Sequence, residues 1–252
     1  MRAFVALLLS AVALAACAEV PADPEDRAEF ERINDPIEPF NRVVFDVNVK
    51  FDHWLARPVA RRYRDWVPDW VRARIHNMVL NIDDPWTFAN DVLQGEPDRA
   101  AQTLVRFFFN STVGLAGAFD VIAATGGPRH HGEDFGQTLA VWGAPEGPYV
   151  MLPFYGPSNP RDMVGRAAAW FGDPADLLLA EASDAATSAR FGLDTLDTRT
   201  DLLDPIDELE RSSLDFYAAV RSLYRQNRAN DIANRDQPLT QFNKPAGAGE
   251  LP

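Results

Sequence analysis

Apolar residues repeat at intervals of three and four positions near the start of the chain, and this spacing constrains the fold more than any other feature. The repeat consists of Phe40, Val43, Val44, Val47, Phe51, Trp54 and Leu55. Such spacing places apolar side chains on one face of an α-helix. Pro36 suits the first turn of this helix, which is expected to end before Arg57-Pro58. Strand signals are few, because sustained alternation and Asn-Gly or Asp-Gly turns are missing. The sequence therefore predicts a mainly α-helical fold.

Proline and glycine divide the rest of the chain into further short helices. Helices are expected over residues 59–66, 69–80, 83–94, 97–108, 135–142, 161–172, 182–199 and 204–233, and an extended apolar loop over 147–158. The helix at 83–94 is expected to restart at Asp83-Asp84-Pro85, and Gly95 to stop it. The helix at 204–233 has a narrow apolar stripe with charged flanks, so it is expected to lie at the surface and face water.

The most apolar part of the chain lies between Arg106 and Asp120 and begins with Phe107, Phe108 and Phe109. It is shorter than the roughly 20 residues that a membrane-spanning helix needs. A buried or re-entrant segment is therefore expected. Gly114 and Gly117 would permit close helix approach there, in a membrane or in a tight core.

The start of the chain resembles a bacterial lipoprotein signal. Arg2 precedes a short apolar run that ends in Leu14-Ala15-Ala16-Cys17, which resembles a lipobox. Residues 1–16 are then a signal peptide, and Cys17 becomes the acylated first residue of a tether over 17–33. The alternative is an ordinary signal peptide with a chance cysteine. The residue after Cys17 is Ala18, whereas inner-membrane lipoproteins carry Asp at that position. This resembles the signal for sorting to the outer membrane. The body is expected over 34–235 and a disordered tail over 236–252.

Charge and cysteine content exclude several classes. The net charge is −13, which argues against nucleic acid as a partner and against membrane docking by a polybasic patch. Cys17 is the one cysteine, so once it is acylated no thiol is left for a disulfide. The fold must then hold by packing alone.

One basic concentration stands out in this acidic chain. It contains Arg57, Arg61, Arg62, Arg64, Arg72 and Arg74, with Trp54, Trp66 and Trp70 among them. Arginine with tryptophan suits a lipid headgroup zone, where rings sit at the boundary and guanidinium groups reach phosphates. Arg61, Arg62 and Arg64 are therefore candidates for headgroup contact. The alternative is a solvated helix face with buried tryptophans.

No pattern for catalysis is recognisable. Ser111 and Ser158 do not lie in a Gly-x-Ser-x-Gly elbow, and a phosphate loop and a dinucleotide fingerprint are missing. His130 and His131 are adjacent, so they cannot both face one metal from a helix. We expect no enzyme activity, no metal and no cofactor beyond the acyl modification, with an unfamiliar catalytic site as the alternative.

Motifs along residues 34–180 resemble those of the MlaA/VacJ lipoprotein family. The opening NDPIEPFNR at 34–42 resembles the family's N-D-P-[LI]-E-x-F-N-R. The other matching motifs are RPVA at 57–60, NIDDP at 81–85, LQG at 93–95, RFFFNSTVG at 106–114, FDV at 119–121, FGQTL at 135–139, GPYVMLP at 147–153 and RD at 161–162. Residues after 180 carry no motif that we can assign.

The resemblance implies an outer-membrane component of the Mla phospholipid transport system in a Gram-negative bacterium. Family members are rings of amphipathic α-helices in the inner leaflet, around a central amphipathic channel and without a spanning helix. They associate with porin trimers, take mislocalised phospholipid from the outer leaflet and pass it to an MlaC-like periplasmic carrier.

On this reading we expect lipid or membrane contact at one set of apolar residues: Phe40, Val44, Phe51, Trp54, Phe107, Phe108 and Phe109. For Phe40, Val44, Phe51 and Trp54, packing in the core is the alternative. Two rival functions stay open at this point, a structural porin-associated lipoprotein without transport activity and a phospholipase.

Overall fold

The computed structural model describes residue 23 and residues 33–175 and 184–234. The expected signal peptide, Cys17, nearly all of the tether and the expected tail lie outside these residues and stay predictions. The described chain is predominantly helical, as predicted. Its helices and strands are α3 (Glu38–Phe51), a π-helical segment η1 (Asp52–Ala56), α4 (Arg57–Trp66), α5 (Asp69–Gln94), α6 (Pro97–Thr112), α7 (Val121–Ala124), α8 (Phe135–Val141), β1 (Val150–Leu152), β2 (Gly156–Ser158), α9 (Pro160–Gly172), α11 (Asp184–Asp201), α12 (Leu203–Ser212) and α13 (Phe216–Ile232).

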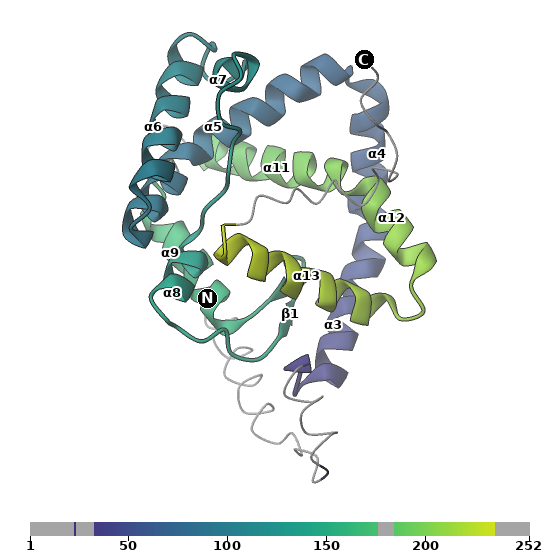
Figure 1. Cartoon of the computed structure of the whole chain (residues 1–252). Helices are drawn as coiled ribbons and strands as arrows, with labels where there is room; N and C mark the ends of the chain where they lie inside the picture. The colour runs from purple at the N-terminus through teal and green to yellow at the C-terminus, as the bar shows by residue number, and fades with distance from the viewer. Residues whose placement is uncertain (1–22, 24–32, 176–183, 235–252) are drawn as a thin grey trace, which may run out of the picture.

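The helices follow one another around a ring (Figure 1). α3, η1 and α4 form one side, α5 and α6 run along the next, and α8 and α9 lead toward α13. Contacts close the circuit, because α5 touches α8, α8 touches α13, α13 touches β2, and β1 touches α3. α11 crosses between α4 and α5. Among the described residues, no helix combines the length and the apolar character that crossing a bilayer requires. The predicted helical ring is confirmed.

The predicted break between 80 and 83 is wrong, because α5 continues through Pro85. An internal proline removes one backbone hydrogen bond and costs about 3 kcal/mol. α5 packs along α6 and α8, and its face bearing Asn81, Asp84 and Thr87 is buried in that packing. This tertiary packing outweighs the local cost of the proline.

The long helix predicted at 204–233 is also wrong, because it is divided into α12 and α13 at residues 213–215. Ser213 has an extended backbone, and the Asp215 side chain accepts a hydrogen bond from the Ala218 N–H and so caps α13. The division redirects the chain so that Phe216 and Tyr217 pack edge-to-face on Phe45. A continuous amphipathic pattern did not reveal this change of direction.

The extended apolar loop at 147–158 forms a small hairpin that sequence patterns did not predict. β1 and β2 pair antiparallel, with Val150 opposite Ser158. α3 holds the hairpin by side chains: Asn41 accepts from the Met151 N–H and donates to the Tyr149 carbonyl, and Asn48 accepts from the Phe154 N–H and donates to the Leu152 carbonyl. Strands of three residues carry too little alternation to be recognised.

The apolar core is small and lies where α3, the hairpin and α13 meet. It consists of Val44, Phe45, Tyr149, Met151 and Tyr217, with Phe40, Val49, Phe216, Val220 and Tyr224 packed against it. The core therefore joins the two ends of the helical chain rather than filling the centre of the ring.

Candidate functional site

The distribution of side chains between interior and surface is the reverse of that in most globular proteins. Among the described residues, the buried set holds 10 apolar and 20 polar or charged side chains. Large apolar side chains lie outside instead, with Trp54 77% exposed and Phe171 79% exposed. Trp66, Trp70, Trp142 and Trp170 are also exposed. Contiguous exposed apolar surface marks a site of contact with a membrane or another protein.

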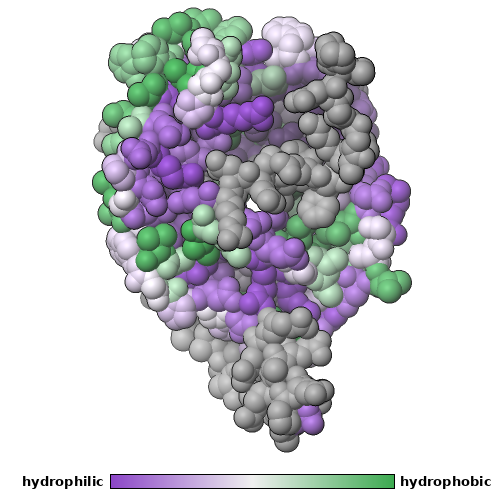
Figure 2. Space-filling model, viewed as in Figure 1, coloured by the Kyte–Doolittle hydropathy of each residue, from purple (hydrophilic) through white to green (hydrophobic). Residues whose placement is uncertain are grey.

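One apolar patch covers the end of α6 and the turn that follows it. It comprises Phe108, Phe109, Val113, Leu115 and Phe119, all exposed. Figure 2 shows hydrophobic side chains gathered over this corner, whereas hydrophilic side chains spread across the middle of the face. Of the two alternatives expected for the segment between Arg106 and Asp120, burial in the protein is wrong for these five side chains, and a re-entrant segment stays a prediction. Arg106 and Asn110 on the opposite side of α6 are buried and bind Asp120, which turns the apolar side outward.

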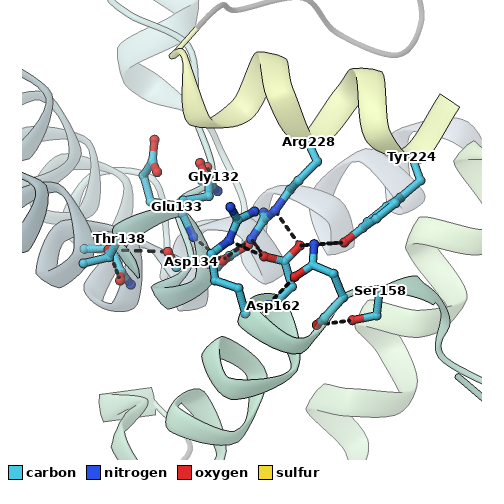
Figure 3. A network of polar contacts seen from close by, with 12 residues as sticks. Gly132, Glu133, Asp134, Thr138, Ser158, Asp162, Tyr224 and Arg228 are labelled. Atoms are coloured by element: carbon cyan, nitrogen blue, oxygen red, sulfur yellow. Dashed lines mark hydrogen bonds and ion pairs between the residues drawn. The ribbon is translucent and has the colours of Figure 1, made fainter. Parts of the chain in front are cut away.

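The polar interior includes a network that joins α13 to the first turns of α8 and α9 (Figure 3). Arg228 donates to both carboxylate oxygens of Asp134, at 2.6 and 2.8 Å, and to Asp162 at 2.9 Å. The Tyr224 hydroxyl donates to Asp162 at 2.5 Å. Burial disfavours the charged form of Asp134, but Arg228 outweighs burial and lowers its pKa.

A second network joins α13 to the residues that precede α3. Arg221 donates to Asp35 at 2.7 Å and to Glu38 at 3.0 Å, and the Tyr217 hydroxyl donates to Asp35 in a short hydrogen bond. Asn41 also donates to Asp35, at 2.7 Å. We call the two networks together the α13 seam. It fastens the last described helix to the first one and to α8 and α9, and so closes the ring.

A third buried group lies where α5 meets the loop that follows α7. Asp84 is 1% exposed, and neither of its carboxylate oxygens has a hydrogen-bond partner in the described part of the chain. His130 Nε2 lies 3.4 Å from Asp84 Oδ1. Burial raises the pKa of Asp84 to about 7, and burial together with Arg106 lowers the pKa of His130 to about 4. The two groups are therefore held toward their neutral forms.

Two groups of side chains bring three metal-type ligand atoms together. Asp91, His131 and Glu133 form one, and His76, Asp197 and Asp201 the other. In the first, Arg99 donates to Glu133 at 2.8 Å and lies 3.7 Å from Asp91, so the guanidinium supplies the positive charge that a cation would bring. In the second, His76 Nδ1 is already 2.6 Å from Asp197 as a hydrogen-bonded pair. We assign a metal to neither, and the absence of a metal and of a cofactor stays a prediction.

The apolar residues expected at the lipid lie in two different environments. Val44 is buried at 8% exposure, and Phe40 packs against the core beside it. Phe51 packs edge-to-face on Phe154 at 4.9 Å. Trp54, Phe108 and Phe109 are exposed, and Phe107 is partly buried. Val44 is buried, whereas the other six keep at least part of their surface exposed, and lipid contact stays a prediction for the whole set.

The arginines expected at headgroups are mostly engaged with α12. Arg61 donates to Asp207 at 2.5 Å, and Arg64 donates to Asp204 at 2.9 Å. We call these two ion pairs the α4–α12 seam. Arg62 instead lies over the Trp66 ring at 5.7 Å. The partners of Arg61 and Arg64 lie far along the chain, so the sequence showed the basic concentration without showing what it binds.

The comparisons with known proteins agree with this architecture. The family model described as MlaA lipoprotein matches residues 33–231. The chain is 36% identical to the "Intermembrane phospholipid transport system lipoprotein MlaA" of Escherichia coli K12 over 247 residues, covering 96% of this chain and 93% of that protein. The protein of the same name from Haemophilus influenzae is 30% identical over 231 residues, covering 87% and 86%.

A solved structure is also similar. It is described as "Structural basis for maintenance of bacterial outer membrane lipid asymmetry" and superposes with a TM-score of 0.69 at 35% identity. The match covers 79% of this chain and 98% of the solved chain.

Proposed function

The chain belongs to the MlaA lipoprotein family, and from this premise we propose that it removes mislocalised phospholipid from the outer leaflet of the outer membrane. It passes the lipid to a periplasmic carrier and so maintains lipid asymmetry. The relatives named above are lipoproteins of an intermembrane phospholipid transport system.

The reversed distribution of side chains is the observation that carries this proposal. A ring with exposed tryptophan and phenylalanine and a polar interior suits a body set into one leaflet. Burying apolar side chains among lipid tails is worth about 25 cal/mol per Å², whereas leaving them in water is unfavourable. Indole rings favour the boundary between tails and headgroups.

The same arrangement supports a path for an amphipathic molecule. An amphipathic lipid needs polar walls for its headgroup and apolar walls for its acyl chains, and the ring carries both kinds of side chain. Passage makes and breaks no covalent bond, so we propose a translocator and not an enzyme. Direction follows from the carrier, because a ligand moves toward the state that binds it more tightly.

Anchoring and partners complete the proposal. Acyl chains on Cys17 attach the body to the periplasmic face of the outer membrane, at about 0.8 kcal/mol per buried CH₂. Porin trimers and an MlaC-like carrier are proposed as partners from the family resemblance, and the exposed apolar surface offers area for a porin. Replacing Cys17 by Ser removes the acylated atom, so metabolic labelling with fatty acid is expected to vanish. Undiminished labelling contradicts the lipobox.

A transfer assay tests the function. The protein is reconstituted into vesicles that carry a labelled phospholipid, and an excess of acceptor is added with or without the periplasmic carrier. Transfer of intact lipid that depends on the protein is the expected result. No transfer supports the structural porin-associated lipoprotein instead, and released fatty acid supports a phospholipase.

A further inference from the structure

Arg166 on α9 differs from most arginines in the described part of the chain. Those arginines pair with carboxylates, as Arg228 and Arg61 do. The Arg166 guanidinium instead lies over the Tyr155 ring, 5.7 Å from its centroid, and no carboxylate of the described residues is within ion-pair distance. In a chain with a net charge of −13, a guanidinium without an acidic partner among the described residues is available to an anion from outside.

Three aromatic rings meet beside Arg166, and each comes from a different element. Tyr155 lies in the turn between β1 and β2, Trp170 on α9 and Phe191 on α11. The Tyr155 centroid lies 6.5 Å from that of Trp170 and 6.4 Å from that of Phe191, with the ring planes tilted. All three rings are exposed. The chain thus presents several ring faces to the surroundings next to a guanidinium that no carboxylate of the described residues pairs with.

We propose that Arg166 and these three rings bind the headgroup of a zwitterionic phospholipid, with the phosphate on Arg166 and the ammonium group against the rings. This inference rests on the proposed function and names the class of lipid that the protein prefers. Guanidinium binds phosphate oxygens through paired, charge-assisted hydrogen bonds. Faces of tryptophan and tyrosine attract an ammonium group through the ring quadrupole.

The geometry without lipid explains how both halves of the headgroup are accommodated. Arg166 itself occupies the face of Tyr155, which shows that this face accepts a cation. When a phosphate draws the guanidinium toward itself, the ring face becomes available to the ammonium group that follows the phosphate in the same headgroup. The headgroup of phosphatidylglycerol carries the phosphate but no ammonium group, so it uses only the first of these contacts.

Competitive lipid binding tests the proposal. The full chain in detergent is mixed with equimolar phosphatidylethanolamine and phosphatidylglycerol of identical acyl chains, and bound lipid is counted by native mass spectrometry. The wild type is expected to prefer phosphatidylethanolamine several-fold. Arg166→Gln is expected to weaken binding of both lipids about tenfold, the loss typical of one charge-assisted contact. Trp170→Leu keeps the apolar bulk and is expected to weaken phosphatidylethanolamine alone.

Arg129→Gln is the matched control. Arg129 is also exposed. Among the described residues it has no carboxylate within ion-pair distance and no aromatic ring facing its guanidinium, so its loss is expected to change the binding of neither lipid. Circular dichroism checks that each variant is folded.

Three results overturn the proposal. If the wild type binds the two lipids equally, the ammonium group makes no favourable contact with the rings. If Arg129→Gln and Arg166→Gln have equal effects, binding depends on overall positive charge and not on this site. Equally tight binding of free glycerophosphoethanolamine, without acyl chains, assigns the site to a soluble phosphodiester. If the wild type transfers lipid but shows no preference, this inference fails and the proposed function stands. If it neither binds nor transfers phospholipid, the proposed function fails as well.

Discussion

Two seams of the ring use the same chemistry, arginine against carboxylate, but water reaches them to different extents. In the α13 seam, the side chains of Arg221 and Asp35 are 11% and 0% exposed. In the α4–α12 seam, those of Arg64 and Asp204 are 34% and 77% exposed. Buried charges are costly to leave unpaired, whereas exposed pairs contribute little. The burial of the ion pairs therefore contributes more to ring closure than their number does.

Arg228→Met gives the largest expected effect. It leaves Asp134 without its bidentate partner and buried Asp162 with Arg161 as its remaining arginine, so unfolding free energy should fall by about 3 kcal/mol. Urea unfolding in detergent, followed by circular dichroism, measures the loss. A decrease below about 1 kcal/mol would show that burial does not distinguish the two seams.

Asp84→Asn tests a buried carboxylate that has no arginine bonded to it. The folded pKa of about 7 lies above the ordinary value of 3.8, so the stability contributed by Asp84 is present below pH 4 and is lost as pH rises through 7. Asparagine removes that loss. The unfolding free energy of the variant should therefore exceed that of the wild type by about 2 kcal/mol at pH 8 and equal it near pH 4.

Thermal unfolding at both pH values checks this prediction. His130 is present in both proteins, so its opposite pH dependence largely cancels in the difference. A variant that is less stable than the wild type at pH 8 contradicts the argument.

Tyr217→Phe removes one donor from the α13 seam without removing a charge. Asp35 loses a hydrogen bond in a buried site, so we expect a loss of about 1.5 kcal/mol. Tyr63→Phe is the matched control, because the Tyr63 hydroxyl is buried without a partner and its removal should cost nothing. Equal melting temperatures for the two variants would refute the assignment.

Arg64→Gln should have the smallest effect. Its pair with Asp204 is exposed on both sides, so the loss should stay below about 0.5 kcal/mol and shrink further in high salt. A loss as large as that of Arg228→Met, measured in the same unfolding assay, would remove the distinction between the seams.

Local patterns predicted the helices well, because a helix is specified by spacing, proline and caps within a few residues. The stripe beginning at Phe40 became α3 and η1, although its predicted end before Arg57 is wrong because the chain stays helical into α4. The short helix before Gly143 became α8. Failures occurred where distant contacts decide the outcome. Pro85 stays inside α5 because of packing against α6, and the chain turns at Ser213 because Tyr217 reaches Phe45.

The candidate site was only partly predictable for the same reason. Aromatic residues near Trp54 and Phe108 signalled an apolar surface, since their number exceeds what a small core can use. Nothing local marks Arg166 as unpaired or Arg228 as paired, because that depends on carboxylates and rings brought near by the fold. Neither did the sequence distinguish Val44, which is buried, from its exposed neighbour Val43.

The attachment of the hairpin to α3 sets a limit on the length of that helix. Two helical turns separate Asn41 from Asn48, a rise of about 10.5 Å, and the extended chain advances about 10 Å from Tyr149 to Leu152, whose carbonyls the two side chains bind. The two asparagine side chains on α3 therefore have nearly the same spacing as the backbone groups of the hairpin that they bind. Inserting one residue into α3 between these asparagines would rotate Asn48 by about 100° and detach the hairpin. A single-residue change of length there should be as damaging as the loss of the hairpin itself.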